Sequence, residues 1–566
     1  MHLSRIIAVL ALTALLAPSA TAQSPRDDLV RLVPDDVAMC LVVHDLRGQG
    51  DKLLKSPWAK ALNESAFGKV LGDAPELLKL EEVQKQLAKR LHIEWDKLRD
   101  DILGDALVFA YRPGPPGQPE KEQGIFLLHA RDPALLTKLF ERLNELQTKS
   151  GELKGLKQHQ HKGFKYTQRL ESGHSQFFVV DGNFLAFTGQ EEMLRKVLDR
   201  RADAKLPPLP LVKHLKDAGC DKALASVWIN PRAFEPLLQA QAKELGETPE
   251  GKSLKTFLGY WKALDGITLS LDVAKGPAVV LGVHAQIDLL PPAARKVALE
   301  SANKSELWSR FPADSIMTLA VRTDFEALIE TFDQLMPGQA ETGLAELLQK
   351  SLGVPLSKEF LKELAPHIGP DVGFCVAGNP VKDEFPHILF ALRIRPKPDE
   401  PGFDKSLVTA LQFLAAAGVG DYNRKHKDQI QFKTLKQDGV EVKYLVNDEK
   451  FPKGFQPAFA AKEGYLVLGS SPEALKRFAA GASAVPSATQ DSPLLRLSFP
   501  KLSRLIKDRR DVLLNFLTEQ RQLSKQEAEG RYKALTWGLS LFERAELVQR
   551  TTGNHVAWVF RLQTVD

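Results

Sequence analysis

The chain is poor in cysteine, tyrosine and tryptophan. Among its 566 residues there are three cysteines, seven tyrosines and seven tryptophans. Three cysteines do not make the dense disulfide framework of small secreted domains, so a packed apolar core has to stabilise the fold. Most of the 29 phenylalanines fall in apolar strand or helix patterns, which is typical of core residues and not of a stacking platform.

Long apolar runs and an excess of one charge are also missing. After the N-terminus no stretch approaches the ~20 apolar residues that span a bilayer, so we expect no membrane span. The 76 basic and 71 acidic residues leave a formal net charge of only +5. Because nucleic-acid-binding proteins usually gather basic residues on one face, this balance argues against a nucleic-acid partner.

The first 22 residues have the pattern of a secretory signal peptide. Arg5 supplies positive charge, an apolar run from Ile6 to Ala17 follows, and Ala20-Thr21-Ala22 is a small-x-small cleavage site. The run of about 12 residues is too short to span a membrane. We therefore predict that residues 1–22 are removed and that the mature chain is exported, to the periplasm or outside the cell.

A repeated order of sequence blocks is the most informative feature present. Pro34-Asp35-Asp36 precedes an apolar strand-like run, and Pro312-Ala313-Asp314 precedes another. The segment from Lys262 to Leu271 is similar to that from Lys533 to Leu541. Further blocks recur in the same order, which predicts an internal duplication.

The repeat sets the expected organisation of the chain. We predict a first repeat domain at 23–287, a linker at 288–310 and a second repeat domain at 311–566. Short strands separated by hairpin signals such as Asp181-Gly182-Asn183 indicate antiparallel pairing. With helices interspersed, the predicted class is α+β, each domain having a mainly antiparallel sheet packed by helices.

The duplication also tests candidate sites, because a site shared by both copies must appear twice. The pair His159 and His161 suits a metal, yet it has no counterpart and no third ligand nearby. The serines at Ser470-Ser471 fit a helix N-cap better than a nucleophile, and they too are unmatched.

Acid pairs and cysteines give no stronger signal. The acid pairs, at Asp35-Asp36, Asp100-Asp101 and Glu191-Glu192, are more typical of caps and turns than of general acids. Cys40 and Cys375 lie in apolar runs, whereas Cys220 lies in a turn-like loop and is the one candidate for a reactive thiol. We therefore predict no catalytic residues, no metal and no cofactor.

One chemical pattern does recur in both copies. Cationic or potentially cationic residues end matching strands, and they would form an anion-binding patch if these ends were adjacent. The alternative is that strand ends simply favour polar side chains. The residues, paired across the copies, are His44 with Arg322, His129 with Arg393, and Arg131 with Arg395.

The export signal, the repeated Pro-x-Asp motif before a strand and the block order resemble those of an uncharacterised family of exported bacterial proteins, known as a domain of unknown function. No catalytic residues are defined for that family, so the resemblance carries none over to this chain. The sequence favours a non-enzymatic binding or interaction module whose partner is a cell-envelope protein or a small ligand. The alternatives are a carrier of an apolar ligand in a sheet–helix cavity and a hydrolase with an unrecognised site.

Overall fold

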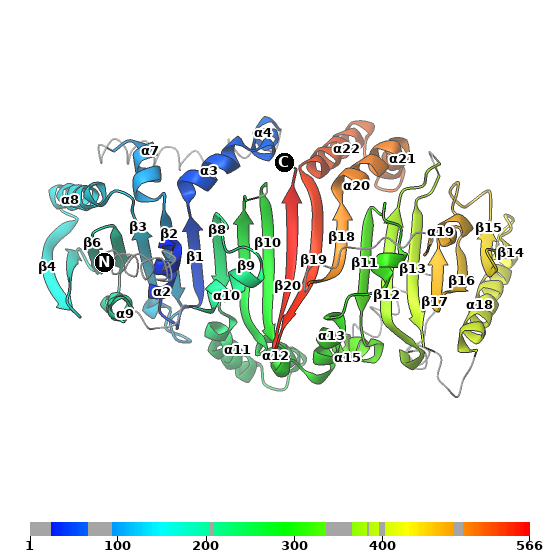
Figure 1. Cartoon of the computed structure of the whole chain (residues 1–566), viewed down its shortest axis with the longest axis horizontal. Coiled ribbons are helices and arrows are strands. Elements are labelled where there is room, and N and C mark those ends of the chain that lie inside the picture. The colour runs from blue at the N-terminus through cyan, green and yellow to red at the C-terminus, as the bar shows by residue number, and fades with distance from the viewer. Residues whose placement is uncertain are drawn as a thin grey trace, which may run out of the picture.

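The computed structural model describes residues 24–65, 93–203, 209–274, 276–335, 365–381, 384–395, 402–479 and 491–565. The predicted signal peptide lies outside these residues. The described strands form one sheet of 20 strands, and all their pairings are antiparallel (Figure 1). Helices pack on both faces of this sheet, so the predicted α+β class with antiparallel strands is confirmed.

Ten strands of the first half form one side of the sheet. In spatial order from the outer edge inward they are β4 (Leu153–His161), β5 (Phe164–Glu171), β6 (Ser175–Asp181), β7 (Phe184–Thr188), β3 (Gln123–His129), β2 (Ala106–Arg112), β1 (Met39–His44), β8 (Ala225–Ile229), β9 (Leu264–Asp272) and β10 (Ala278–Gln286).

Ten strands of the second half have the same order from the opposite edge. They are β14 (Gln431–Gln437), β15 (Val440–Val446), β16 (Ala458–Lys462), β17 (Tyr465–Gly469), β13 (His387–Ile394), β12 (Ile368–Ala377), β11 (Met317–Arg322), β18 (Asp491–Ser498), β19 (Phe542–Thr552) and β20 (His555–Thr564).

The two halves join at the middle of the sheet. Strand β10 pairs with β20 along nine residues, with Leu281 opposite Phe560 (Figure 1). The sequence pattern did not predict this edge-to-edge junction. Since antiparallel pairing leaves no free edge at β10 or β20, the only open edges of the described sheet are β4 and β14.

Helices in the first half follow the cap signals of the sequence. Asp132 accepts hydrogen bonds from the amides of Ala134 and Leu135, and α8 (Pro133–Ser150) begins with proline, as predicted. Asn230 caps α11 (Pro231–Leu245) in the same way. The other helices of this half are α2 (Pro25–Leu32), α3 (Leu46–Lys55), α4 (Pro57–Glu64), α7 (Trp95–Lys97), α9 (Glu191–Ala202), α10 (Pro210–Asp217) and α12 (Pro249–Trp261).

Seven helices of the second half lie in the part of the chain that the structure describes. They are α14 (Leu307–Arg310), α15 (Phe325–Leu335), α18 (Phe403–Lys425), α19 (Pro472–Lys476), α20 (Phe499–Asp508), α21 (Arg510–Glu519) and α22 (Lys525–Ser540). In the predicted linker, 288–310, the chain forms α13 (Pro292–Ser301) and α14, and Leu307 and Trp308 are buried in the second core. No described helix is long and apolar enough to cross a bilayer.

One block match is wrong. Residues Lys533 to Ser540 belong to helix α22, whereas Leu264–Asp272 is strand β9. The strand that occupies the place of β9 in the second half is β19, which begins at Phe542. The two segments share Lys-Ala-Leu and Leu-Ser-Leu but have different secondary structures, because short apolar segments occur in both helices and strands.

Candidate functional site

The structure does not gather the six predicted anion-patch residues. His44 and His129 both lie opposite Ala106, on one face of the two strands that flank β2, and Arg131 follows on the surface. Strand β11, with Arg322, lies seven strand spacings from β1, about 34 Å away. Because seven antiparallel pairings separate β1 from β11, the two strands run in opposite directions. His44 and Arg322, which each end their strand, therefore point to opposite ends of the strands.

Several of these residues are already paired within the chain. Arg322 lies 2.9 Å from Glu300 and 3.6 Å from Asp371. Arg393 lies 3.8 Å from Glu306 and over the ring of Tyr465. Burial and nearby Arg26 lower the pKa of His44, which favours its neutral form. The geometry therefore supports ion pairs that fasten strand ends, and not one anion site.

The other candidates from the sequence also have structural roles. His159 and His161 lie in strand β4, not in a loop, where they contact Gln168 and Asp199. All three cysteines are free and buried, and the prediction of a reactive Cys220 is wrong because burial raises its pKa to about 11. Among the described residues no group of three or more His, Cys, Asp or Glu is arranged to hold a metal ion.

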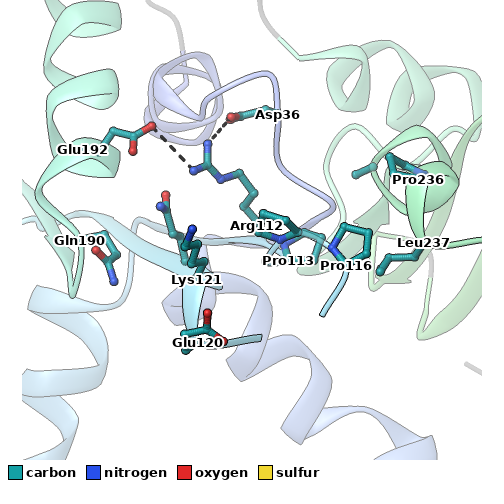
Figure 2. Close-up of a pocket in the computed structure, with 14 residues that line it drawn as sticks. Asp36, Arg112, Pro113, Pro116, Glu120, Lys121, Gln190, Glu192, Pro236 and Leu237 are labelled. Atoms are coloured by element: carbon teal, nitrogen blue, oxygen red, sulfur yellow. Dashed lines mark hydrogen bonds and ion pairs between the residues drawn. The ribbon is translucent and has the colours of Figure 1, made fainter. Parts of the chain in front are cut away.

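A hollow of about 450 Å³ in the first half is built around the end of β2 (Figure 2). It is lined by Arg112 and the proline-rich loop after it, by the start of α9, and by Pro236 and Leu237 of α11. Figure 2 shows the Arg112 guanidinium reaching both Asp36 and Glu192, with Pro116 and Leu237 on the other wall. This half therefore places its own cation between two carboxylates.

A hollow of about 620 Å³ lies at the matching place in the second half. The strand pairings make His387 the counterpart of Gln123, because these residues begin β13 and β3 opposite the ends of β12 and β2. Glu473 corresponds to Glu192, the second helical residue of α19 and α9. We call these two the first hollow and the second hollow.

An ion pair of the Pro-x-Asp motif recurs in both halves. Asp36 lies 2.9 Å from Lys196 of α9, and Asp314 pairs with Arg477, which directly follows α19 and is as far from the start of that helix as Lys196 is from the start of α9. Burial raises the pKa of Asp36, but the hydrogen bonds and charges of Lys196 and Arg112 outweigh it and hold this pKa below its usual value. The repeated aspartate therefore fastens the chain before β1 or β11 to the following helix.

The two hollows differ at the position of Arg112. The strand register puts Ala377 there in the second half, since Arg112 pairs with Gln123 and Ala377 pairs with His387. In the part of the chain that the structure describes, Glu473 has no ion pair, whereas Glu192 has Arg112 at 3.7 Å and Lys196 at 3.3 Å. The second hollow thus lacks the built-in cation of the first.

Each hollow is also lined by a residue that has a buried polar atom without a partner among the described residues. The Oε1 atom of Gln123 and the Nδ1 atom of His387 are inaccessible and make no hydrogen bond to any described residue. His387 is 4% exposed. Burial and nearby Arg477 lower the pKa of His387, so its imidazole is neutral near pH 7. Such atoms are rare in native proteins because each costs desolvation free energy.

A third hollow, of about 480 Å³, lies at the junction of the halves. The Trp228 indole donates to Nδ1 of His214, which leaves the proton of His214 on Nε2, 3.6 Å from Asp265. His555 of β20 places Nδ1 3.3 Å from the same carboxylate. Burial and the nearby His214 lower the pKa of His284, stacked on His214, to about 3. The cluster holds one carboxylate between two imidazoles.

An apolar row crosses the face of the sheet opposite the main core. Sixteen residues, one from each strand from β6 to β16 in spatial order, lie directly opposite one another. They are Phe178, Phe187, Phe126, Phe109, Leu41, Val227, Leu269, Leu281, Phe560, Leu547, Leu495, Leu319, Phe374, Phe390, Leu468 and Phe459.

The middle of this apolar row is exposed. Helix α8 covers its outer part in the first half and α18 packs near Leu468 in the second. Between them, Leu269 is 48% exposed, Leu281 38% and Leu319 40%. The sequence showed the apolar strands, but only the register shows that their side chains form one continuous row.

Comparison of the chain with protein-family models, with curated proteins and with solved structures finds no match. The functional argument therefore depends on the geometry of these sites.

Proposed function

We propose that the protein is an exported, non-enzymatic interaction protein, built from a duplicated α+β unit, which binds a protein partner across the apolar row. The observation that carries this proposal is the exposure of Leu269, Leu281 and Leu319 in the middle of a continuous apolar row. Large exposed apolar patches on soluble proteins usually mark interaction surfaces, because leaving them in water is unfavourable.

The dimensions of the apolar row favour a protein partner. From Leu41 on β1 to Leu319 on β11 the row crosses eight strands, or about 34 Å at the usual strand spacing. A drug-sized ligand is instead enclosed on most sides in a concave pocket. An open face of this length suits the flat core of a protein–protein interface, which is apolar and surrounded by polar residues.

The apolar row also supports the duplication. Corresponding strands of the two halves each contribute one residue, and the residues match in kind: Phe126 with Phe390, Phe109 with Phe374, and Leu41 with Leu319. The strand order is the same in both halves, and Leu281 meets Phe560 at the centre. A duplicated unit that paired with its own copy through its last strand would give this arrangement. Export follows from the signal pattern of residues 1–22.

Site-specific photo-crosslinking in the producing cell tests the interaction. A photo-reactive phenylalanine analogue at Leu281 should crosslink one discrete protein, identified by mass spectrometry. The same analogue at Phe413, which is 73% exposed on α18 away from the centre of the row, is the matched control and should give no such product. Equal products at both positions, or none at Leu281, would refute the proposal.

One observation favours the hydrolase alternative. Because Asp265 faces Nδ1 of His555, the other ring nitrogen of His555 is oriented as a general base is in many hydrolases. A panel of ester, phosphoester and glycoside substrates tests it, with His555→Ala as the control variant. Turnover that this variant abolishes would favour a hydrolase over the interaction protein.

A further inference from the structure

We propose that the second hollow binds a small organic cation, in which an ammonium group is carried on an aromatic or alkyl body. This inference does not depend on the protein partner proposed above. It rests on the contrast between two matching hollows, only one of which has a cation at the position of Arg112.

The charges of the second hollow are mainly negative. Glu384, Asp448 and Glu473 line it, and its one lysine, Lys453, lies 3.9 Å from Glu384. Acidic side chains alone do not define a site, since they are common on solvated surfaces. Here the first hollow provides a comparison, because it shows which chemical group of the chain occupies the matching position in the other half.

In the first hollow the accepted group is a guanidinium. Arg112 lies between Asp36 and Glu192, as Figure 2 shows. In the second half the strand register puts Ala377 at the position of Arg112, and Glu473, the counterpart of Glu192, has no ion pair among the described residues. A ligand ammonium near Glu473 would restore the charge pairing that Arg112 supplies in the first half.

The walls of the second hollow suit an apolar body next to the ammonium group. Phe451 and Phe455 line it, with ring centroids 5.6 Å apart in an edge-to-face arrangement, and Phe455 also contacts Phe385 at 4.7 Å. Val381, also in the lining, is 48% exposed. Aromatic faces attract cations through the ring quadrupole, and a volume of about 620 Å³ is in the usual range for ligand sites.

His387 is the independent observation that points to a ligand. Its side chain is almost fully buried, it lines the hollow, and Nδ1 has no hydrogen-bond partner in the described part of the chain. With its proton on Nε2, the neutral imidazole of His387 has Nδ1 as its acceptor nitrogen, and Nδ1 then suits an ammonium N–H. The proposed ligand therefore satisfies both Glu473 and His387.

Isothermal titration calorimetry on the full chain, with 3-phenylpropylamine as the probe, tests the proposal. At pH 7 the amine carries an ammonium group, and 3-phenylpropan-1-ol is its neutral counterpart. We expect the amine to bind at one site and the alcohol at least about tenfold more weakly. No binding of the amine at millimolar concentration, or equal binding of the alcohol, would overturn the proposal.

Matched variants locate the site. His387→Phe removes the acceptor at similar size and should weaken binding at least about tenfold, whereas His387→Gln reproduces the residue of the first hollow and should retain most of the affinity. Glu473→Gln should weaken binding by roughly fivefold. Glu192→Gln, the same change in the first hollow, should have no effect. If Glu473→Gln and His387→Phe, shown to be folded by circular dichroism, leave the affinity unchanged, the proposal is wrong.

Discussion

The two hollows have the same framework and different contents. In each, a strand begins at a residue with a buried, unpartnered polar atom, Gln123 or His387, and the second residue of α9 or α19 is a glutamate. The first hollow contains Arg112 between two carboxylates, whereas the second is lined by phenylalanines, and Ala377 has the register position of Arg112. The comparison teaches that the repeated parts maintain the fold, while the positions that differ between the halves are where specific binding is to be sought.

The largest loss of stability is expected from truncating a matched core residue in either half. Leu194 of α9 and Leu475 of α19 occupy the same position and are both almost fully buried. Truncating either to alanine leaves a cavity and should lower the free energy of unfolding by about 2–5 kcal/mol. Denaturant unfolding measures the loss, and hydrogen exchange assigns it to one half. A cost below about 1 kcal/mol at either position would contradict the equivalence of the two cores.

A smaller loss of stability is expected from a change in the histidine cluster at the junction of the halves. A Cβ atom on Gly266 would lie 2.3 Å from Nδ1 of His214 and 2.8 Å from Nε1 of Trp228. Gly266→Ala should therefore break their hydrogen bond and destabilise the protein by roughly 1–3 kcal/mol.

Gly259→Ala is the control for this junction variant. Gly259 lies in helix α12 with no atom within 4 Å of the added Cβ, so alanine there should stabilise the helix by up to about 1 kcal/mol. Thermal unfolding of both variants gives the sign of each effect. A destabilised Gly259→Ala, or an unaffected Gly266→Ala, would show that the junction cluster is not packed as described.

The smallest loss of stability is expected from removing the charge of the aspartate in the Pro-x-Asp motif. Asp36 has two cationic partners and Asp314 one, so Asp36→Asn should cost more stability than Asp314→Asn at pH 7, though less than about 1 kcal/mol. The pKa of Asp36 is lowered by folding, so its contribution is present above the unfolded pKa near 4 and is lost as the pH falls through the folded value.

Unfolding at several pH values between 3 and 7 measures the contribution of Asp36. The stability of the native protein should fall on acidification more steeply than that of Asp36→Asn. Parallel curves would mean that Asp36 contributes no pH-dependent stability.

The sequence predicted the strands, the caps and the repeated order better than it predicted the sites. Caps such as Asp132 depend on neighbouring residues and are visible in the sequence. The β10–β20 junction and the apolar row depend on which strands pair, and pairing between distant segments leaves no local signal. Lys533–Ser540 was misassigned because its apolar string suits either helix or strand.

The hollows were missed for a related reason. Gln123 and His387 are ordinary residues in the sequence, and only the strand register makes them counterparts. The contrast between Arg112 and Ala377 becomes visible once that register is known. A repeat alignment tied to strand positions, and not to short matching strings, is the signal that would have found it.

The most direct test of the contrast between the hollows is a crystal structure of the protein with 3-phenylpropylamine. The amine should occupy the second hollow, with its nitrogen within hydrogen-bond distance of Nδ1 of His387 and close to Glu473. The first hollow, where Arg112 holds the matching place, should bind none. An amine found in the first hollow, or in neither, would contradict the account.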